Sequence, residues 1–277
     1  MTILQKINKV LSIGGTELVR KPHIKEDTSQ FGTFKLIEEM IPNVKRGAEP
    51  EYIIDIGAAD GIEASNTYHL YNRGFRGLLI EPDTEKFANL AKVHKNSAIS
   101  LYRGYATPEN ILDIFRFFEV PKKPLFMSLD IDGMDYYVLE KILSGYRPTL
   151  ICAEINENIP PPIKFTVTCH VSEDLIKKHL YGMSIASLGE LCRKFKYDII
   201  VLNYINAVIV PKERNTFNRS LTPEQAYAYG YMNQTFRKQK FPWDSDMEPL
   251  LDLPVSEGID FINKKFSAYP NLYRVGV

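Results

Sequence analysis

The order of short apolar runs and amphipathic segments between residues 51 and 211 constrains the fold more than any other feature of the sequence. Runs such as YIIDIG, PLFMSLDID and TLICAEIN lack polar alternation, which is typical of strands buried on both faces. Segments such as EKFANLAKVHK and MDYYVLEKILSG repeat apolar residues every three or four positions, as amphipathic helices do. Strands and helices that alternate in this way predict an α/β domain with a mostly parallel sheet.

The last two apolar runs, DIIVLN and NAVIVP, are joined by only a few residues. A parallel crossover needs about a dozen residues or more, so the last strand should run antiparallel to its neighbours. We therefore predict a seven-stranded, mostly parallel sheet in residues 51–211, with an insertion at 157–184. Helical extensions are expected on both sides, at residues 1–50 and in the aromatic-rich tail 212–277.

Composition excludes several classes of protein. Lys plus Arg and Asp plus Glu both number 34, so there is no general basic field that would attract nucleic acid. No apolar run approaches the roughly 20 residues of a membrane span. Cys152, Cys169 and Cys192 have no CxxC spacing, so neither a zinc site nor a disulfide framework is expected. The expectation is a reduced, cytoplasmic protein.

The stretch EYIIDIGAADGIEASN, residues 51–66, passes from a predicted strand to a predicted helix through small residues. Ligands of open parallel sheets bind beyond the carboxyl ends of the strands. Gly57 and Gly61 would let the backbone approach a ligand closely, and Ala58 adds little bulk. Asp60 places a carboxylate in the same turn. A turn that serves packing alone is the alternative, because the complete G-x-G-x-x-G fingerprint is missing.

Glu81 ends the second apolar run, RGLLIEP, about twenty residues after Asp60. An acidic residue at this position can accept hydrogen bonds from both hydroxyls of a ribose. The alternative is a solvated acid at the start of the next helix.

Three motifs together resemble the class I S-adenosylmethionine (SAM)-dependent methyltransferases, and specifically the FkbM-like family. They are Asp55-Ile56-Gly57-Ala58-Ala59-Asp60-Gly61, Ile80-Glu81-Pro82 and Ser128-Leu129-Asp130-Ile131-Asp132-Gly133. The stretch RPTLICAEIN also looks like the fifth strand of that group. The resemblance covers about residues 50–210. It implies a Rossmann-like fold, SAM as cofactor, and methylation of hydroxyl or related groups, often on sugars and natural products.

The resemblance also implies roles for single residues. Asp55 and Gly57 would line the methionine end of the cofactor, and Glu81 would hold its ribose hydroxyls. Tyr105 and Ala106 would lie against adenine, although Tyr105 replaces an acidic residue often found there. The other expected cofactor contacts are Gln30 in the element Gln30-Phe31-Gly32, Ala58, Asp60, Gly61, Pro82 and Asp130.

Polar residues also follow the fourth and fifth predicted strands: Asp130 and Asp132 after one, Glu154 and Asn156 at the end of the other. We expect the two aspartates to face opposite ways, so that only one, Asp130, reaches the cleft. Asp130 and Glu154 are the expected catalytic acids. With Asn156 they offer the oxygen ligands that Mg²⁺ or another divalent cation prefers. Direct binding of cofactor and substrate without a metal is the alternative.

Two further features lie in the insertion and the tail. His170 is a candidate general base, although a lone loop histidine can also be incidental. The tail stripe AYAYGYM, residues 226–232, with Phe241 and Trp243 nearby, predicts a cleft wall or a docking surface for a second copy of the chain. Core packing of the tail is the alternative.

These observations favour a SAM-dependent methyltransferase that O-methylates a saccharide or a saccharide-linked small polar acceptor. An NAD-dependent oxidoreductase is disfavoured by the incomplete glycine fingerprint and the antiparallel end strand. A non-catalytic cofactor-binding assembly protein is disfavoured by the acids at both strand ends. The sequence does not name the acceptor, and substrate choice is expected to lie in the insertion and the tail.

Overall fold

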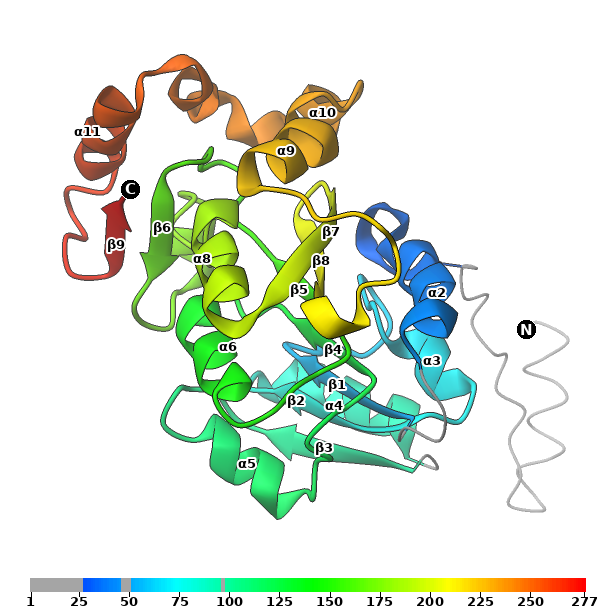
Figure 1. The fold of residues 1–277 in the computed structure, drawn as a ribbon. Helices are drawn as coiled ribbons and strands as arrows, with labels where there is room; N and C mark the ends of the chain where they lie inside the picture. Colours follow the sequence, from blue (N-terminus) through cyan, green and yellow to red (C-terminus); the bar gives the residue numbers. More distant parts are fainter. Residues whose placement is uncertain (1–26, 46–50, 96–97) are drawn as a thin grey trace, which may run out of the picture.

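The computed structural model describes residues 27–45, 51–95 and 98–277, and its centre is a seven-stranded sheet (Figure 1). The strand order is β3-β2-β1-β4-β5-β8-β7. The strands are β1 (Tyr52–Ile56), β2 (Arg76–Glu81), β3 (Ile99–Arg103), β4 (Phe126–Leu129), β5 (Leu150–Glu154), β7 (Tyr197–Asn203) and β8 (Asn206–Pro211). Neighbouring strands in the series β3, β2, β1, β4 and β5 pair in parallel. Strand β8 pairs antiparallel with β5 and β7. The predicted Rossmann-like sheet with an antiparallel last strand is confirmed.

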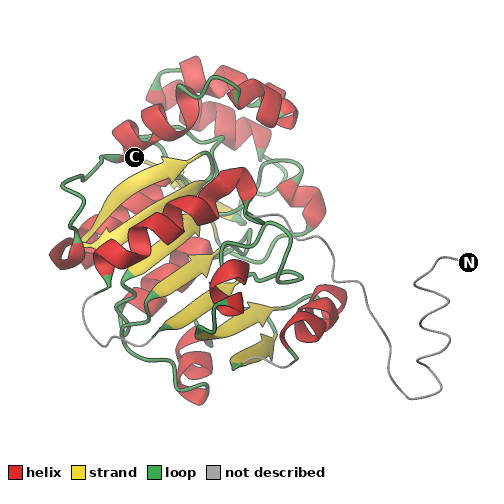
Figure 2. Ribbon diagram, turned by 90° about the vertical axis from the view of Figure 1, so that its right-hand side faces the viewer, coloured by secondary structure: helices red, strands yellow, loops and turns green. Residues whose placement is uncertain are grey.

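Helices cover both faces of this sheet (Figure 2). One layer contains α2 (Thr33–Val44), α3 (Tyr68–Asn72) and α4 (Thr84–His94), and the other contains α5 (Ile111–Phe117), α6 (Asp135–Leu143) and α8 (Ile185–Phe195). Successive residues of a strand point to opposite faces. Ile53 packs with the first layer and Ile54 with the second, so all five residues of β1 are buried. The helices pack on the two faces of the sheet, so a site can form at the carboxyl ends of its parallel strands.

The helix expected directly after the glycine turn begins later, at Tyr68, and residues 57–67 form a loop. The hydroxyl of Thr67 donates a hydrogen bond to the buried carboxylate of Asp55. The hydroxyl oxygen of Ser65 accepts from the backbone N–H groups of Thr67 (3.2 Å) and Tyr68 (3.0 Å). Side chains that bond to nearby backbone in this way hold the chain in a non-helical turn.

The insertion and the tail fold together. Strand β6 (Lys164–Val167) of the insertion pairs antiparallel with β9 (Tyr273–Gly276) of the tail. The remaining helices are α7 (Glu173–Ile176), α9 (Pro223–Tyr227), α10 (Arg237–Lys240) and α11 (Val255–Lys265). A separate apolar cluster joins the two segments through Phe165, Leu180, Leu250, Ile262 and Phe266. The tail is therefore not only helical, as we expected, but ends in a strand that completes the insertion.

The tyrosine stripe of the tail divides between core and surface. Tyr227 and Tyr231 are buried in the main core, whereas Tyr229 is 55% exposed. Core packing thus accounts for two of the three tyrosines, and a contact between copies through the tail stays a prediction. The boundaries at residues 51 and 211 also stay a prediction, and residues 1–26 of the expected N-terminal extension lie outside the described residues. In the part of the chain that the structure describes, no helix is long and apolar enough to cross a bilayer.

Phe266 provides a test of the core shared by insertion and tail. Its side chain is 1% exposed, and its ring lies 5.9 Å from that of Phe165 and 5.6 Å from that of Tyr273. Phe266→Ala should lower the free energy of unfolding by roughly 3–5 kcal/mol because it opens a cavity. Phe117→Ala, at a side chain that is 79% exposed, should change it by less than about 0.5 kcal/mol. Urea unfolding of both variants is the measurement, and equal effects would contradict the shared core.

Candidate active site

The glycine turn after β1 positions the end of β4. Gly57 has φ of 90°, and a Cβ atom at this residue would stand 1.6 Å from the carbonyl oxygen of Asp130. The backbone N–H of Asp130 donates to the carbonyl of Ile56 at 2.9 Å. Only glycine allows this approach, since any side chain would displace the Asp130 backbone. The first role of Gly57 is therefore to place Asp130 beside the turn.

Glu81 at the end of β2 holds the same turn from the other side. Its buried carboxylate accepts hydrogen bonds from the backbone N–H groups of Ala59 and Asp83, both at 2.8 Å. Each carboxylate oxygen keeps acceptor capacity for another donor. The structure thus fixes the orientation of Glu81 while its side chain still lines a cavity.

Four residues expected to contact a cofactor serve the turn. Asp60 accepts hydrogen bonds from the backbone N–H groups of Ile62 and Glu63, both at 2.9 Å, and so closes the loop. A Cβ atom at Gly61 would stand 2.5 Å from Leu90 Cδ1, so Gly61 is required for packing against α4. The other two residues are buried. Ala58 belongs to an apolar core cluster, and Asp55 accepts the hydrogen bond from Thr67 that holds the loop. None of the four lines the cavity beside Glu81, so their contact with a cofactor stays a prediction.

The loop after β4 brings three carboxyls together. Asp130, Asp132 and Glu154 each offer one oxygen, and these oxygens lie within 4.8 Å of one another. Asp132 has φ of 53°, so the chain has left the extended conformation by this residue. The expectation that Asp130 and Asp132 face opposite ways is wrong, because residues two apart in an extended strand share a face, and the left-handed Asp132 also keeps its carboxyl beside that of Asp130. We call Asp130, Asp132 and Glu154 the acid triad.

Burial raises the pKa of all three triad carboxyls. The pKa of Asp130 rises to about 8, first through loss of solvent and then through repulsion by Asp132. The pKa of Glu154 is raised well above its usual range by burial and by Asp130, and burial also raises that of Asp132. No Lys, Arg or His within residues 27–45, 51–95 and 98–277 lies within ion-pair distance of the triad. A positive charge brought to the triad would therefore stabilise its ionised form.

Asn156, which we expected to be a metal ligand, has a structural role. Its amide nitrogen donates to the carbonyls of His179 and Tyr181, both at 3.0 Å, and its amide oxygen accepts from the Asn158 backbone at 3.1 Å. The side chain is fully buried. All its polar atoms fasten the insertion to the end of β5, so Asp132 replaces Asn156 in the candidate metal site.

A cavity of about 330 Å³ lies beyond β1, β2 and β4. Glu81, Pro82, Ala106 and Asp130 line it, as expected from the sequence. Tyr105 also lines it, and the rings of Tyr105 and His170 pack with their centroids 4.2 Å apart. Partial burial lowers the pKa of His170. The structure thus places this histidine beside the residue expected at adenine.

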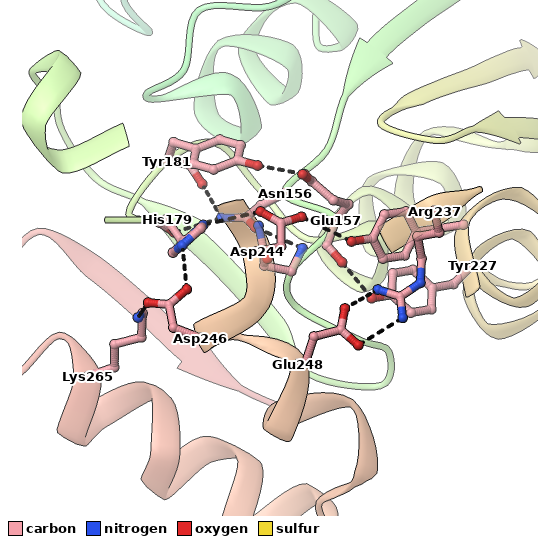
Figure 3. Close-up of polar contacts among 12 residues, drawn as sticks. Asn156, Glu157, His179, Tyr181, Tyr227, Arg237, Asp244, Asp246, Glu248 and Lys265 are labelled. Atoms are coloured by element: carbon pink, nitrogen blue, oxygen red, sulfur yellow. Dashed lines mark hydrogen bonds and ion pairs between the residues drawn. The ribbon is translucent and has the colours of Figure 1, made fainter. Parts of the chain in front are cut away.

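A larger cavity of about 570 Å³ adjoins the first. Glu154 lines it, and Gln30, expected at the cofactor, lies here instead. Insertion and tail provide most of the wall, through residues to which we had given no site role or only a general one: Glu157, Ile176, His179, Tyr181, Phe241 and Trp243. Figure 3 shows how polar contacts fasten several of these segments to one another. Of these residues, the sequence indicated a possible cleft wall only for Phe241 and Trp243.

The two cavities meet at the acid triad. Asp130 lines the smaller cavity, Glu154 lines the larger one, and Asp132 lines both. Ile176 of α7 is the other residue that both share. The arrangement provides two adjoining chambers with a carboxyl cluster at their junction.

Comparison with known proteins adds likeness in fold. No family model matches the chain, and neither does any curated protein. A protein described as a hemolysin from Lactococcus lactis is 11% identical, with 74% of this chain and 99% of that chain covered and a TM-score of 0.46. The SAH-bound N-terminal domain of EvdMO1 is 12% identical, covering 76% and 97%, with a TM-score of 0.43. An O-methyltransferase from Bacillus cereus in complex with SAH is 15% identical, covering 75% and 90%, with a TM-score of 0.37. At such identities and scores the likeness carries no functional conclusion.

The buried Asp55 makes folding dependent on pH. Burial raises its pKa to about 6, whereas an unfolded aspartate titrates near about 3.9. Between these values the folded chain binds a proton that the unfolded chain has lost, so stability falls as pH rises through this window. Relative to Asp55→Asn, which cannot ionise, wild type should lose about 1–3 kcal/mol of unfolding free energy between about pH 4 and about pH 7. Urea unfolding of both proteins measures this, and a difference that does not change with pH would contradict it.

Proposed function

We propose that this chain is a SAM-dependent methyltransferase of the FkbM-like type that methylates a hydroxyl of a saccharide or of a saccharide-linked small acceptor. The observation that supports it most is the junction of two cavities at the acid triad, at the carboxyl ends of β4 and β5. Transfer between two bound molecules needs such a junction, because the reacting atoms must come within about 3–3.5 Å of each other. We assign the smaller cavity to the cofactor and the larger one to the acceptor.

The side chains of the smaller cavity fit SAM in their chemistry. Glu81 would accept hydrogen bonds from the ribose hydroxyls, since its carboxylate is fixed and keeps free acceptor capacity. The Tyr105 ring would pack on adenine, with His170 beside it. Asp130 would lie at the positively charged end of the cofactor. Bound there, SAM would supply an electrophilic methyl group.

The chain itself would orient the acceptor and remove its proton. Methylation of a hydroxyl releases one proton, and a carboxylate at the junction can accept it as a general base. Asp132 and Glu154 both line the acceptor cavity, and their raised pKa makes each carboxylate a stronger base than a solvated one. His170 packs on Tyr105, so we now assign it to the nucleoside end and no longer to proton transfer.

We further propose a divalent cation, Mg²⁺ or another, at the acid triad. Three carboxyl oxygens within 4.8 Å of one another match the oxygen ligands of such ions. The cation would offset the repulsion among the carboxyls, hold the acceptor hydroxyl and lower its pKa. The positive end of the cofactor is the alternative partner of the same carboxyls.

The proposal includes a small-molecule partner and a reducing, cytoplasmic setting. The equal numbers of acidic and basic residues give no support to nucleic-acid binding. The thiols of Cys152, Cys169 and Cys192 are free, which is compatible with a reducing compartment. Exposed aromatic side chains of the tail, Tyr229 and Phe236 among them, are where a contact between copies is proposed.

Calorimetric titration with S-adenosylhomocysteine (SAH), and separately with NAD, tests the cofactor. We expect SAH to bind and NAD to fail. Glu81→Ala should weaken SAH binding by roughly 1–3 kcal/mol, the contribution of charge-assisted hydrogen bonds to the ribose. Glu85→Ala, which removes an exposed carboxylate from the first turn of α4, is the matched control and should leave the affinity unchanged. Binding of NAD without SAH would reject the proposed function.

Electron paramagnetic resonance of added Mn²⁺ tests the cation. We expect the SAH complex of the wild type to bind Mn²⁺ and Asp130→Asn to bind it at least about tenfold more weakly, a difference of about 1.4 kcal/mol. SAH affinity and urea unfolding of the variant show whether it remains folded. Wild type that leaves Mn²⁺ free would remove the metal and keep the methyltransferase proposal.

A further inference from the structure

The larger cavity has an uneven balance of charge. Asp132, Glu154 and Glu157 line it, together with two basic residues, Lys177 and His179. Lys177 is 71% exposed and lies 3.8 Å from Glu173, and the His179 ring lies 3.0 Å from Asp246 and 3.6 Å from Asp244, so both already have acidic partners. Asp132 and Glu154 belong to the acid triad and have a proposed partner there. Glu157 lies outside the triad, so the burial of its carboxyl needs a separate explanation.

Glu157 is a buried and rigidly held carboxyl without a basic partner. Its side chain is 2% exposed, and the hydroxyl of Tyr181 donates to its Oε2 at 2.5 Å. The hydroxyl of Tyr227 donates to its backbone carbonyl, which fixes the main chain as well (Figure 3). Across the described ranges, no Lys, Arg or His forms an ion pair with Glu157. The other partner of the Glu157 carboxyl is Asp244, which is itself acidic and shares a hydrogen bond with it. Burying a carboxyl without a positive charge beside it is costly, and groups of this kind cluster at functional sites.

Aromatic rings also line the cavity. Phe31 and Phe241 line it and pack against each other, with centroids 5.3 Å apart, and Trp243 beside them is 62% exposed. This group already attracts one ammonium: Lys240 Nζ lies 5.0 Å from the Phe31 centroid and 4.9 Å from that of Tyr204. Aromatic faces bind cations through the negative charge of their π-systems. Because Lys240 already occupies the faces of Phe31 and Tyr204, Phe241 and the exposed Trp243 are the rings of this wall that remain for a ligand.

We infer that the acceptor carries an ammonium group in addition to its hydroxyl, as an amino sugar does, and that Glu157 binds this ammonium. The inference rests on the proposed function, because it assigns the larger cavity to the acceptor. Glu157 would pair with the ammonium, the exposed ring of Trp243 would cover the apolar face of the sugar, and the triad would meet the hydroxyl. Glu157 is thus the residue that decides specificity.

The titration of Glu157 is consistent with this role. Burial, and next the charge of Asp244, raise the pKa of Glu157 to about 8 when no ligand stands beside it. A bound ammonium would favour the ionised form and lower this pKa. A neutral sugar would bring no such charge, so the cavity should distinguish two sugars that differ only in one amino group.

Glucosamine and glucose form the matched pair of probes for this test. Each is titrated calorimetrically into the full chain saturated with SAH, with Mg²⁺ present. We expect glucosamine to bind at least about tenfold more tightly than glucose, the size of one charge-assisted hydrogen bond. Glu157→Gln should remove most of this preference and leave glucose binding as it was. Glu224→Gln, an exposed carboxylate at the start of α9, is the control and should keep the preference.

Equal affinity for the two sugars, or no detectable binding of glucosamine to wild type, would overturn the inference. So would a glucosamine preference that survives in a folded Glu157→Gln variant, as shown by unchanged SAH affinity. The comparison of the two sugars on wild type needs no variant, so it stands if Glu157→Gln fails to fold. Failure of the proposed function is distinguished beforehand, because SAH would then not bind to wild type at all.

Discussion

The close approach of Gly57 to the backbone of Asp130 is the contact on which the rest of the site depends. The absence of a side chain lets the loop after β1 lie directly against the loop after β4. Two consequences follow from this contact. The Asp130 carboxyl reaches the end of the sheet beside Glu154, and the turn 57–61 lies where Glu81 can hold it through Ala59. Strand β1 lies between β2 and β4, so the turn that contains Gly57 contacts the ends of both neighbouring strands.

The acid triad weakens the fold at the place where its chemistry is concentrated. Three half-buried carboxyls repel one another, and each loses part of the stabilisation that water gives to a charge. The apolar cores on both faces of the sheet compensate for this loss. A cation or a positively charged cofactor would relieve the repulsion, so binding and stability should be coupled at the triad. Such an imbalance is common at functional sites and rare at purely structural ones.

The two cavities are lined by different parts of the chain. The smaller one is lined largely by loops that follow β1 to β4, and these loops belong to the sheet. The larger one needs the insertion and the tail, which meet through the pairing of β6 with β9 and through a separate apolar cluster. Changes in the tail, which does not line the smaller cavity, can therefore alter the larger cavity while Glu81 and Gly57 keep their positions. If the proposed function holds, the tail would act on acceptor choice alone, whereas the insertion would act on both cavities through residues such as His170 and Ile176.

The sequence by itself determined the sheet, its antiparallel last strand and the strand ends that carry Glu81, Asp130 and Glu154. Apolar runs and the length of connections are local properties, so they can be read without coordinates. Tertiary structure decided which strand-end side chains converge. The two-residue period of a strand favours Asp132 on the same side as Asp130, but Asn156, which has the same spacing from Glu154, was turned into the insertion, and no spacing rule indicates this. Glu157 and Trp243 met in one cavity only because segments distant in sequence pack together, and such long-range contacts leave no periodic signal.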